Sequence, residues 1–279
     1  MKEYIKLLRM KHYIKNLLVF VPLFFSGMFF DVYRLRNTMI GFIDFCLVSS
    51  AVYILNDYRD IEKDRKHPTK KNRPLASGKI SVKTAMGIMV VCLAAAVGIC
   101  VWLGNINAMI CLTLYFLLNI GYSMGLKNKP IIDVIILASG FSLRVFFVGF
   151  VADITISKWL YLVVTTGSLY MGLGKRRNEL RKQHETREVL KYYTLSFLDN
   201  NMYVCVALTN VFYALWTVEM RDTRMSWTVL VFIVILMRYS LDTESDSDGD
   251  PVEVILKDRG LILISVIYAC CIFAMLYIL

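Results

Sequence analysis

The amino-acid sequence predicts an all-α, polytopic membrane protein with about nine transmembrane helices. Apolar residues make up 57% of the 279 residues, charged residues make up 19%, and the mean hydropathy is +0.55. A soluble domain of this length contains fewer apolar and more charged residues. The apolar runs lack the strict alternation of a transmembrane β-barrel, so we expect helices that satisfy their own backbone hydrogen bonds.

Nine apolar runs approach the roughly 20 residues that a membrane-spanning helix needs. The loops between them are short, which excludes a large extramembrane domain and predicts a single domain over residues 1–279. The first run is preceded by charged residues and has no small-residue cleavage site after it, so we expect it to be retained. The predicted spans lie at about 17–30, 38–55, 82–103, 108–124, 131–152, 159–173, 200–218, 227–240 and 260–279.

The net charge of +10 is informative through its distribution along the chain. With the N-terminus inside, 26 of the 32 Lys and Arg residues fall in cytoplasmic segments, five fall in the opposite loops, and Arg144 lies within a span. Cytoplasmic loops carry such an excess of Lys and Arg. We therefore predict a multi-pass protein of the inner (plasma) membrane with a cytoplasmic N-terminus and an external C-terminus. The bilayer accounts for this charge, so no nucleic acid is expected, and the oligomeric state stays open.

Two patterns that resemble metal sites do not meet the requirements of one. The seven cysteines lie in apolar runs without CxxC spacing and the three histidines are scattered, so no zinc, haem or iron–sulfur site is expected. Residues 242–260, DTESDSDGDPVEVILKDRG, alternate acids as a calcium loop does. Counted from Glu244, the twelfth position is Ile255, where a calcium loop needs glutamate. We expect a solvated loop there.

The longest polar segment directly continues the second predicted span. Residues 56–81 read NDYRDIEKDRKHPTKKNRPLASGKIS, with no glycine or proline before Pro68, so we expect the helix to continue beyond the membrane surface. Four polar side chains then lie on one face of the helix, within an arc of about 100° around its axis. They are Asn56, Asp57, Asp60 and Asp64. Three carboxylates on one ridge suit Mg²⁺, which is usually shared with substrate phosphates.

An alternative for this segment is a solvated helix whose acids pair with Arg59, Lys63 and Arg65. The position at the end of a span, followed by RPLASGK, favours the metal site. Arg73 and Lys79 in that stretch are candidates for holding phosphate oxygens.

A second polar cluster, YMGLGKRRNELRKQ, follows the sixth predicted span. Its five cations are Lys175, Arg176, Arg177, Arg181 and Lys182. Anchoring of the helix end to anionic lipid and a phosphate-binding pocket are both open interpretations of this cluster.

Polar residues at the end of the fourth span are candidates for the same cytoplasmic site. They are Asn119, Tyr122, Ser123, Lys127, Lys129 and Asp133. Arg144 lies about 16 Å into the fifth span, too deep to reach water easily, so it should face the protein interior. A structural pairing within the bundle and a role in the substrate cavity are both open for it.

Taken together, these motifs resemble the UbiA superfamily of intramembrane prenyltransferases over essentially the whole chain. NDYRDIEKD resembles the family's NDxxDxxxD magnesium–diphosphate motif, and NRPLASGKIS follows it. Within the superfamily, the chain is most similar to the decaprenyl-phosphate phosphoribosyltransferase branch. The similar pieces are KHYIKNLLVFVPLFFSG, GFSLRVFFVG, LYMGLGKRRNEL and DPVEVILKDRGL. The resemblance implies a UbiA-like helical bundle with its active site at the cytoplasmic face.

A departure from the wider family indicates the substrates. Other members are expected to carry a second aspartate-rich motif after the sixth span, where this chain has GKRRNEL. One acidic ridge and one basic cluster suit a metal-bound diphosphate plus a second, metal-free phosphate. The resemblance thus implies transfer of 5-phosphoribosyl from phosphoribosyl pyrophosphate to a polyprenyl phosphate lipid.

In that reaction Asp57, Asp60 and Asp64 would ligate Mg²⁺ with Asn56 beside them. The residues assigned to phosphate contacts by the resemblance are Lys15, Lys127, Lys175, Arg176 and Arg177. Two other functions remain open. A conventional prenyltransferase would move a polyprenyl group from its diphosphate to an aromatic or other acceptor, and a transporter is a more distant alternative.

Overall fold

A computed structural model describes residues 2–182, 187–220, 223–244 and 251–278, and every regular element in these ranges is helical. This confirms the predicted all-α class. Residues 245–250 of the predicted solvated loop lie outside the described ranges. Contacts within the chain group it into two compact units, so the prediction of one domain stays a prediction. Unit 1 comprises Met1–Leu23, Met28–Leu126 and Leu143–Thr155, and unit 2 comprises Phe24–Gly27, Lys127–Ser142 and Ile156–Leu279.

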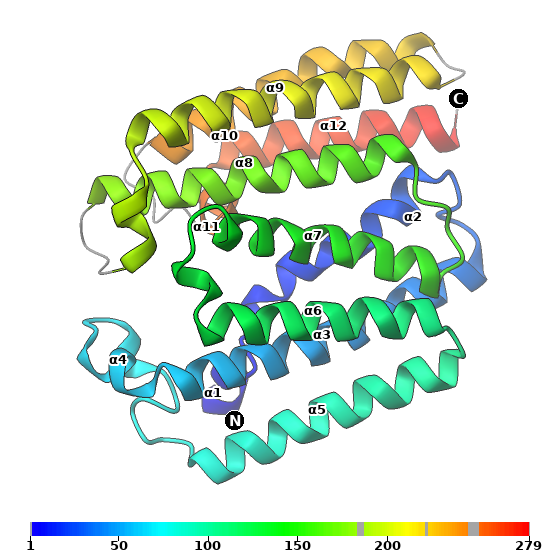
Figure 1. Ribbon diagram of the computed structural model, residues 1–279. Coiled ribbons are helices and arrows are strands. Elements are labelled where there is room, and N and C mark those ends of the chain that lie inside the picture. Colours follow the sequence, from blue (N-terminus) through cyan, green and yellow to red (C-terminus); the bar gives the residue numbers. More distant parts are fainter. Residues whose placement is uncertain (1, 183–186, 221–222, 245–250, 279) are drawn as a thin grey trace. The chain divides into compact units, whose positions relative to one another are not determined.

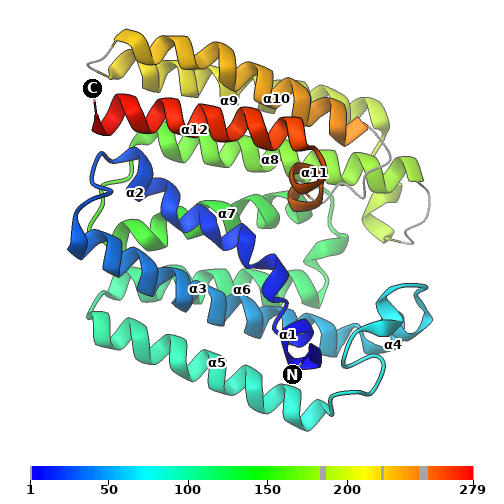
Figure 2. The same cartoon turned by 180° about the vertical axis from the view of Figure 1, so that it is seen from behind.

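Unit 1 is built around α3 (Val32–Arg59), most of whose apolar stretch is buried. Helices α5 (Val82–Leu103) and α6 (Ile106–Met124) lie against it (Figure 1), and η1 (Met10–Phe20) crosses it in the view from behind (Figure 2). Phe45 of α3 is fully buried in the apolar core. The shorter elements are α1 (Lys2–Leu7), α2 (Val21–Phe25), α4 (Ile61–Lys66) and η2 (Lys70–Asn72).

Local sequence explains where the two outer helices of unit 1 begin and end. Ser81 caps α5, because its hydroxyl accepts the backbone N–H of Thr84 at 3.1 Å. The same helix ends at Gly104, whose φ of 65° favours glycine. Asn105 follows at once and caps α6 by accepting the N–H of Ala108 at 3.1 Å. A two-residue connection therefore joins α5 and α6.

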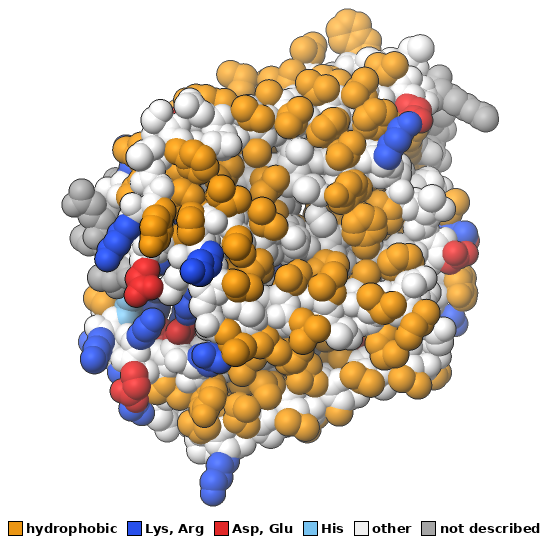
Figure 3. All heavy atoms as spheres, in the orientation of Figure 1, with side chains coloured by type: hydrophobic (Ala, Val, Ile, Leu, Met, Phe, Trp, Pro, Cys, Tyr) orange, Lys and Arg blue, Asp and Glu red, His pale blue; other side chains and the backbone are white. Residues whose placement is uncertain are grey.

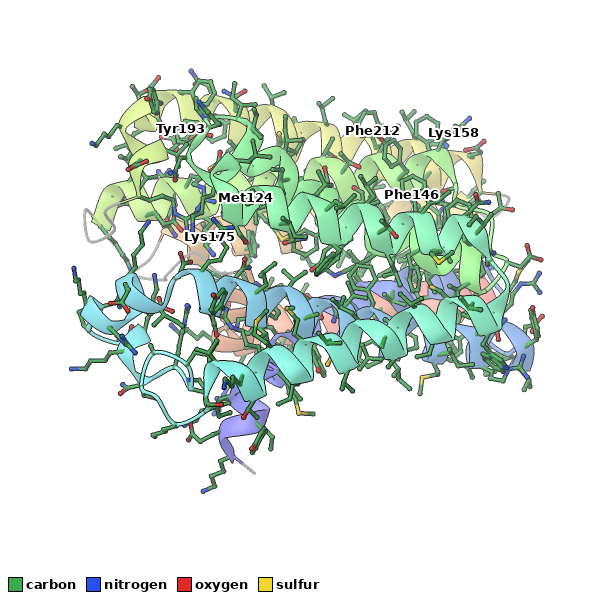
Figure 4. The ribbon with its side chains drawn as sticks, turned by 60° about the horizontal axis from the view of Figure 1, so that its bottom comes forward. Met124, Phe146, Lys158, Lys175, Tyr193 and Phe212 are labelled. Carbon is green, nitrogen blue, oxygen red and sulfur yellow. The ribbon has the colours of Figure 1, made fainter. Side chains whose placement is uncertain are left out.

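Unit 2 is built from α8 (Lys158–Lys182), α9 (Leu195–Glu219), α10 (Thr228–Glu244) and α12 (Arg259–Tyr277). Figure 4 places Lys158 and Phe212 at one end of the α8–α9 pair and Lys175 and Tyr193 at the other, so the two helices are antiparallel. The helix α7 (Ile132–Val151) contributes residues to both units. The remaining elements are η3 (Leu126–Asn128), η4 (Glu188–Tyr192), η5 (Thr223–Trp227) and α11 (Pro251–Lys257).

In the described residues, seven helical segments are long and apolar enough to cross a membrane. The predicted span at 17–30 is instead η1 followed by the five-residue α2. Pro22 has no backbone N–H to continue a regular α-helix through this stretch. The predicted span at 159–173 lies in α8. Because the second half of this helix is polar, α8 is not among the seven segments that are apolar enough to cross a membrane. The number nine stays a prediction.

The surface agrees with a multi-pass membrane protein. Apolar side chains cover α5 and α6 of unit 1, whereas Lys and Arg side chains gather around the end of that unit that carries α4 (Figure 3). On α5 the exposed large side chains include Val90, Val97 and Trp102. Exposed apolar area of this extent is expected where lipid replaces water.

Candidate active site

The acidic segment in unit 1 is bent and not one continuous helix as predicted. Helix α3 ends at Arg59, Asp60 has φ −97° and ψ 8°, and α4 begins at Ile61. The bend is local, since the N–H of Asp60 still reaches the carbonyl oxygen of Asn56 (3.0 Å) and the N–H of Asp64 reaches that of Asp60 (2.8 Å). Asp57 and Asp64 nevertheless converge, as their spacing predicted.

The two carboxylates are buried and paired with arginines. Asp57 is 2% exposed and Asp64 is 4% exposed, so neither of these carboxylates of the predicted ridge faces solvent. Arg73 Nη1 lies 3.1 Å from Asp57 Oδ1 and 2.7 Å from Asp64 Oδ2, and Arg9 also donates to Asp57 Oδ1. The predicted partner Arg65 instead bonds the exposed Glu62, at 2.8 Å. One cation is thus held between two acidic side chains.

Asp57 and Asp64 are the two members of the predicted metal-ligand set that the structure brings together. Among the described residues there is no group of three or more His, Cys, Asp or Glu side chains placed to hold a metal ion. A guanidinium nitrogen already lies within 3.1 Å of both Asp57 and Asp64. Mg²⁺ is commonly held by one or two carboxylates, with water and substrate phosphates completing its shell. The donor set therefore fits the ion without a third carboxylate.

Ser123, an α6 residue from the predicted mouth of the site, meets Asn56. Ser123 Oγ donates to Asn56 Oδ1, and it also lies 2.9 Å from the carbonyl oxygen of Asn119. Tyr122 is half-buried on the same last turns of the helix. The end of α6 is thereby tied to the start of the acidic segment.

Two other predicted phosphate ligands of unit 1 differ in their exposure. Lys79 is exposed, and its Nζ lies 3.7 Å from Glu3 Oε1. Lys15 on η1 is half-buried.

Arg9 was missed from the sequence, although it contacts Asp57 and lies 4.8 Å from the centroid of the Tyr53 ring. The only sequence signal for it was a cation shortly before the first apolar run. Its left-handed backbone conformation, with φ 51°, could not be predicted from the residue type.

Arg144 has the contacts of a structural residue. It is 5% exposed, its Nε donates to Asn16 Oδ1 at 2.9 Å, and its Nη2 donates to Tyr115 Oη at 3.3 Å. Its guanidinium also lies 4.9 Å from the ring centroid of Phe45. Of the two roles left open by the sequence, these contacts support pairing within the bundle.

We expect Arg144→Lys to lower the free energy of unfolding by about 2–3 kcal/mol, because an ammonium group cannot reproduce two hydrogen bonds and a stacked guanidinium. Reversible unfolding in mixed micelles measures this loss. The matched control is Arg34→Lys, where the arginine pairs with Asp31 at a half-exposed site (2.6 Å) and a change below about 1 kcal/mol is expected. Wild-type stability combined with weaker substrate binding would instead assign Arg144 to the substrate.

In unit 2, the three consecutive cations at the end of α8 have different surroundings. Arg176 is fully buried, and its Nε donates to Asp133 Oδ2 at 2.5 Å while its Nη1 donates to Glu179 Oε2 at 2.6 Å. Arg177 is largely buried and donates through Nε to Asp199. Lys175 is half-buried (Figure 4). The sequence did not distinguish these three environments.

Tyr193 completes the network around Arg176. Its hydroxyl donates to Asp133 Oδ1 at 2.6 Å and accepts the backbone N–H of Ile131 at 2.6 Å. Burial, followed by the hydrogen bond to the Asp133 carboxylate, raises the pKa of Tyr193, so the phenol stays protonated and remains a donor. The start of α7 is thus held by a buried side chain. Lys127, before that start, is half-buried.

Seven helical segments of the described chain are long and apolar enough to cross a membrane, and buried carboxylates pair with arginines in polar clusters. Residues 19–257 match the UbiA prenyltransferase family, and the chain belongs to this family. It is therefore a transferase.

Comparison with individual proteins supports the same assignment. The chain is 33% identical to decaprenyl-phosphate phosphoribosyltransferase of Corynebacterium glutamicum, over 98% of this chain and 86% of that one. It is 35% identical to the Mycolicibacterium smegmatis protein of the same name, over 92% and 87% of the two chains. In fold it is similar to a UbiA homologue from Archaeoglobus fulgidus bound to DMAPP and Mg²⁺. The TM-score is 0.72 at 17% identity, with 99% of this chain and 100% of that chain covered.

Proposed function

We propose that this protein catalyses Mg²⁺-dependent transfer of 5-phosphoribosyl from phosphoribosyl pyrophosphate to a polyprenyl phosphate, releasing pyrophosphate. The observation that carries the proposal is the basic end of α8, Lys175 to Arg177, in the part of the chain where a prenyl-diphosphate enzyme would carry further carboxylates. Relatives named for this reaction match nearly the whole chain, which supports it.

Asp57 and Asp64 would hold Mg²⁺ on the pyrophosphate of the donor, with Asn56 and Asp60 beside them. The ion would supply stabilisation of the negative charge that develops on the leaving group. Arg73 already lies between these carboxylates, so it is also placed to neutralise a donor phosphate.

The polyprenyl phosphate supplies the nucleophile. One of its oxygens forms a bond to C1 of the ribose as the bond from C1 to the pyrophosphate oxygen breaks. A phosphate monoester is anionic near neutral pH, so no dedicated general base is required and positioning dominates. The phosphate contacts that we assign to Lys15, Lys79, Tyr122, Lys127, Lys175 and Arg177 are proposals. We assign Arg176 a positioning role, since its guanidinium is fully buried against carboxylates.

A labelled-donor assay tests the proposal. The purified protein in lipid nanodiscs receives phosphoribosyl pyrophosphate labelled in the ribose, a C50 polyprenyl phosphate and Mg²⁺, and lipid products are extracted. We expect label in the lipid fraction, dependent on both the lipid phosphate and Mg²⁺. Label from a prenyl diphosphate in an aromatic acceptor, with none from the ribose donor, would contradict the proposal.

That second outcome corresponds to conventional prenyl transfer, the other candidate function. It is favoured by one observation, the similarity of fold to homologues solved with DMAPP and with GPP. The identities to these proteins are 17%, so the likeness bears on fold and not on substrate.

We also propose an inner-membrane location with the N-terminus in the cytoplasm. In a variant without native cysteines, we expect a membrane-impermeant maleimide to label Arg36→Cys in intact cells and Lys71→Cys only after permeabilisation. Both positions are exposed. The reverse labelling pattern would contradict the orientation drawn from the positive charges.

A further inference from the structure

A buried ion network lies behind the basic end of α8. Asp133 has no exposed surface, and its two carboxylate oxygens accept from different segments of unit 2: Oδ2 from Arg176 on α8 and Oδ1 from Tyr193 after η4. A buried carboxylate with both oxygens engaged, facing a fully buried guanidinium, holds both partners in one orientation. The network therefore fixes the rotation of α8 relative to the start of α7.

The packing beside this network requires a small residue. A Cβ atom at Gly172, one turn before Arg176, would lie 3.0 Å from Val134 Cγ1. The start of α7 therefore lies directly against α8 on the face that carries Arg176. Asp133 directly precedes Val134, and its carboxylate lies 2.5 Å from the Arg176 guanidinium on this same face.

Because Arg176 is held in one orientation, the helix geometry also sets the directions of its neighbours Lys175 and Arg177. Successive residues of an α-helix point about 100° apart, so Lys175 and Arg177 point to either side of Arg176. Arg177 is held through Nε by Asp199, while its Nη1 is buried and without a hydrogen-bond partner among the described residues. A buried guanidinium nitrogen of this kind is a donor that a ligand oxygen can satisfy.

We propose that Asp133 is a positioning residue for the lipid substrate. By locking Arg176, it directs Lys175 and Arg177 toward the phosphate group of the polyprenyl phosphate. This inference rests on the proposed function, in which these two cations meet that phosphate. Arg176 then supports the site without touching the substrate.

The test measures binding of a radiolabelled C50 polyprenyl phosphate to the full-length protein in zwitterionic nanodiscs, without donor. We expect Asp133→Asn to weaken binding by about tenfold, the size of coupling usual between residues in one charged network. In the background of Lys175→Gln, the same change should weaken binding less than about twofold, because the contact that Asp133 positions is already lost. A loss of folded protein would lower the number of sites equally in both backgrounds and leave the dissociation constant unchanged.

Two further variants complete the design. Tyr193→Phe removes one hydrogen bond to Asp133 and should weaken binding by about two- to fivefold while the charges remain, which decides the matter if Asp133→Asn does not fold. Glu219→Gln changes a carboxylate that pairs with Lys158 (3.5 Å) at the other end of α8, and wild-type affinity is expected.

Three results would overturn the inference: wild-type affinity in both Asp133→Asn and Tyr193→Phe, wild-type affinity in Tyr193→Phe when Asp133→Asn does not fold, or equal losses in the presence and absence of Lys175. The wild-type protein is also tested with neutral polyprenol, which lacks the phosphate. If it binds polyprenyl phosphate no more tightly than polyprenol, that result would contradict the proposed function itself. That result is read from the wild type alone and is therefore distinct from the outcomes of the variants.

Discussion

Replacing Asp57 by asparagine is expected to lower the rate of the transferase by on the order of 10³-fold at saturating substrate, because a carboxylate ligand of the proposed Mg²⁺ would be lost and the metal would supply several kcal/mol of charge stabilisation. The measurement is the initial rate of lipid labelling over a range of Mg²⁺ concentrations. Since Asp57 is buried and accepts from Arg9 and Arg73, we also expect a loss of about 1–2 kcal/mol in unfolding free energy. A solvent-facing carboxylate would have had no such cost.

The matched control is Glu62→Gln on the neighbouring α4. Glu62 bonds Arg65 at an exposed site, so its change removes the same charge from the same segment without touching the buried pair. Activity and stability should stay near those of the wild type. If Asp57→Asn retained full activity at limiting Mg²⁺, the buried pair would be structural and the metal assignment would be wrong.

Arg176→Ala is expected to destabilise the protein by about 3–5 kcal/mol, the usual effect of removing one partner from a buried ion pair. Asp133 and Glu179 would be left as buried carboxylates without their cation. Unfolding in mixed micelles measures the loss. Arg181→Ala on the same helix is the control, because Arg181 is exposed and a change below about 1 kcal/mol is expected.

A different result for Arg176→Ala would restore the original interpretation from sequence. Unchanged stability together with a ten- to 150-fold weaker binding of polyprenyl phosphate, the equivalent of about 1.5–3 kcal/mol, would make Arg176 a direct phosphate ligand. The burial of its guanidinium would then have to be relieved in the substrate complex.

Helix positions in this chain could be predicted from the sequence because hydrophobic length decides them. The helical class and most of the spans follow from runs of apolar residues, and the convergence of Asp57 and Asp64 follows from their seven-residue spacing. The interruption at Asp60 could not be predicted, since aspartate does not by itself break a helix.

Partners distant along the chain could not be predicted from local pattern. Arg9 meets Asp57 across 48 positions, through packing of the N-terminal segment on α3. Three adjacent cations at the end of α8 look alike in sequence, yet steps of about 100° on a helix necessarily give them different environments. Which of the three cations is buried depends on the position of α7 beside α8, and this tertiary contact cannot be predicted from local sequence.

Backbone strain at Ile131 is expected to favour local unfolding of the segment directly before α7. Ile131 has φ 69°, a conformation that costs a β-branched residue about 1–3 kcal/mol, and its N–H is held by the Tyr193 hydroxyl. The free energy of opening should therefore be lower here than in the turns of α7 that follow. Amide hydrogen exchange at Ile131 should precede exchange within α7, and Tyr193→Phe should accelerate it further.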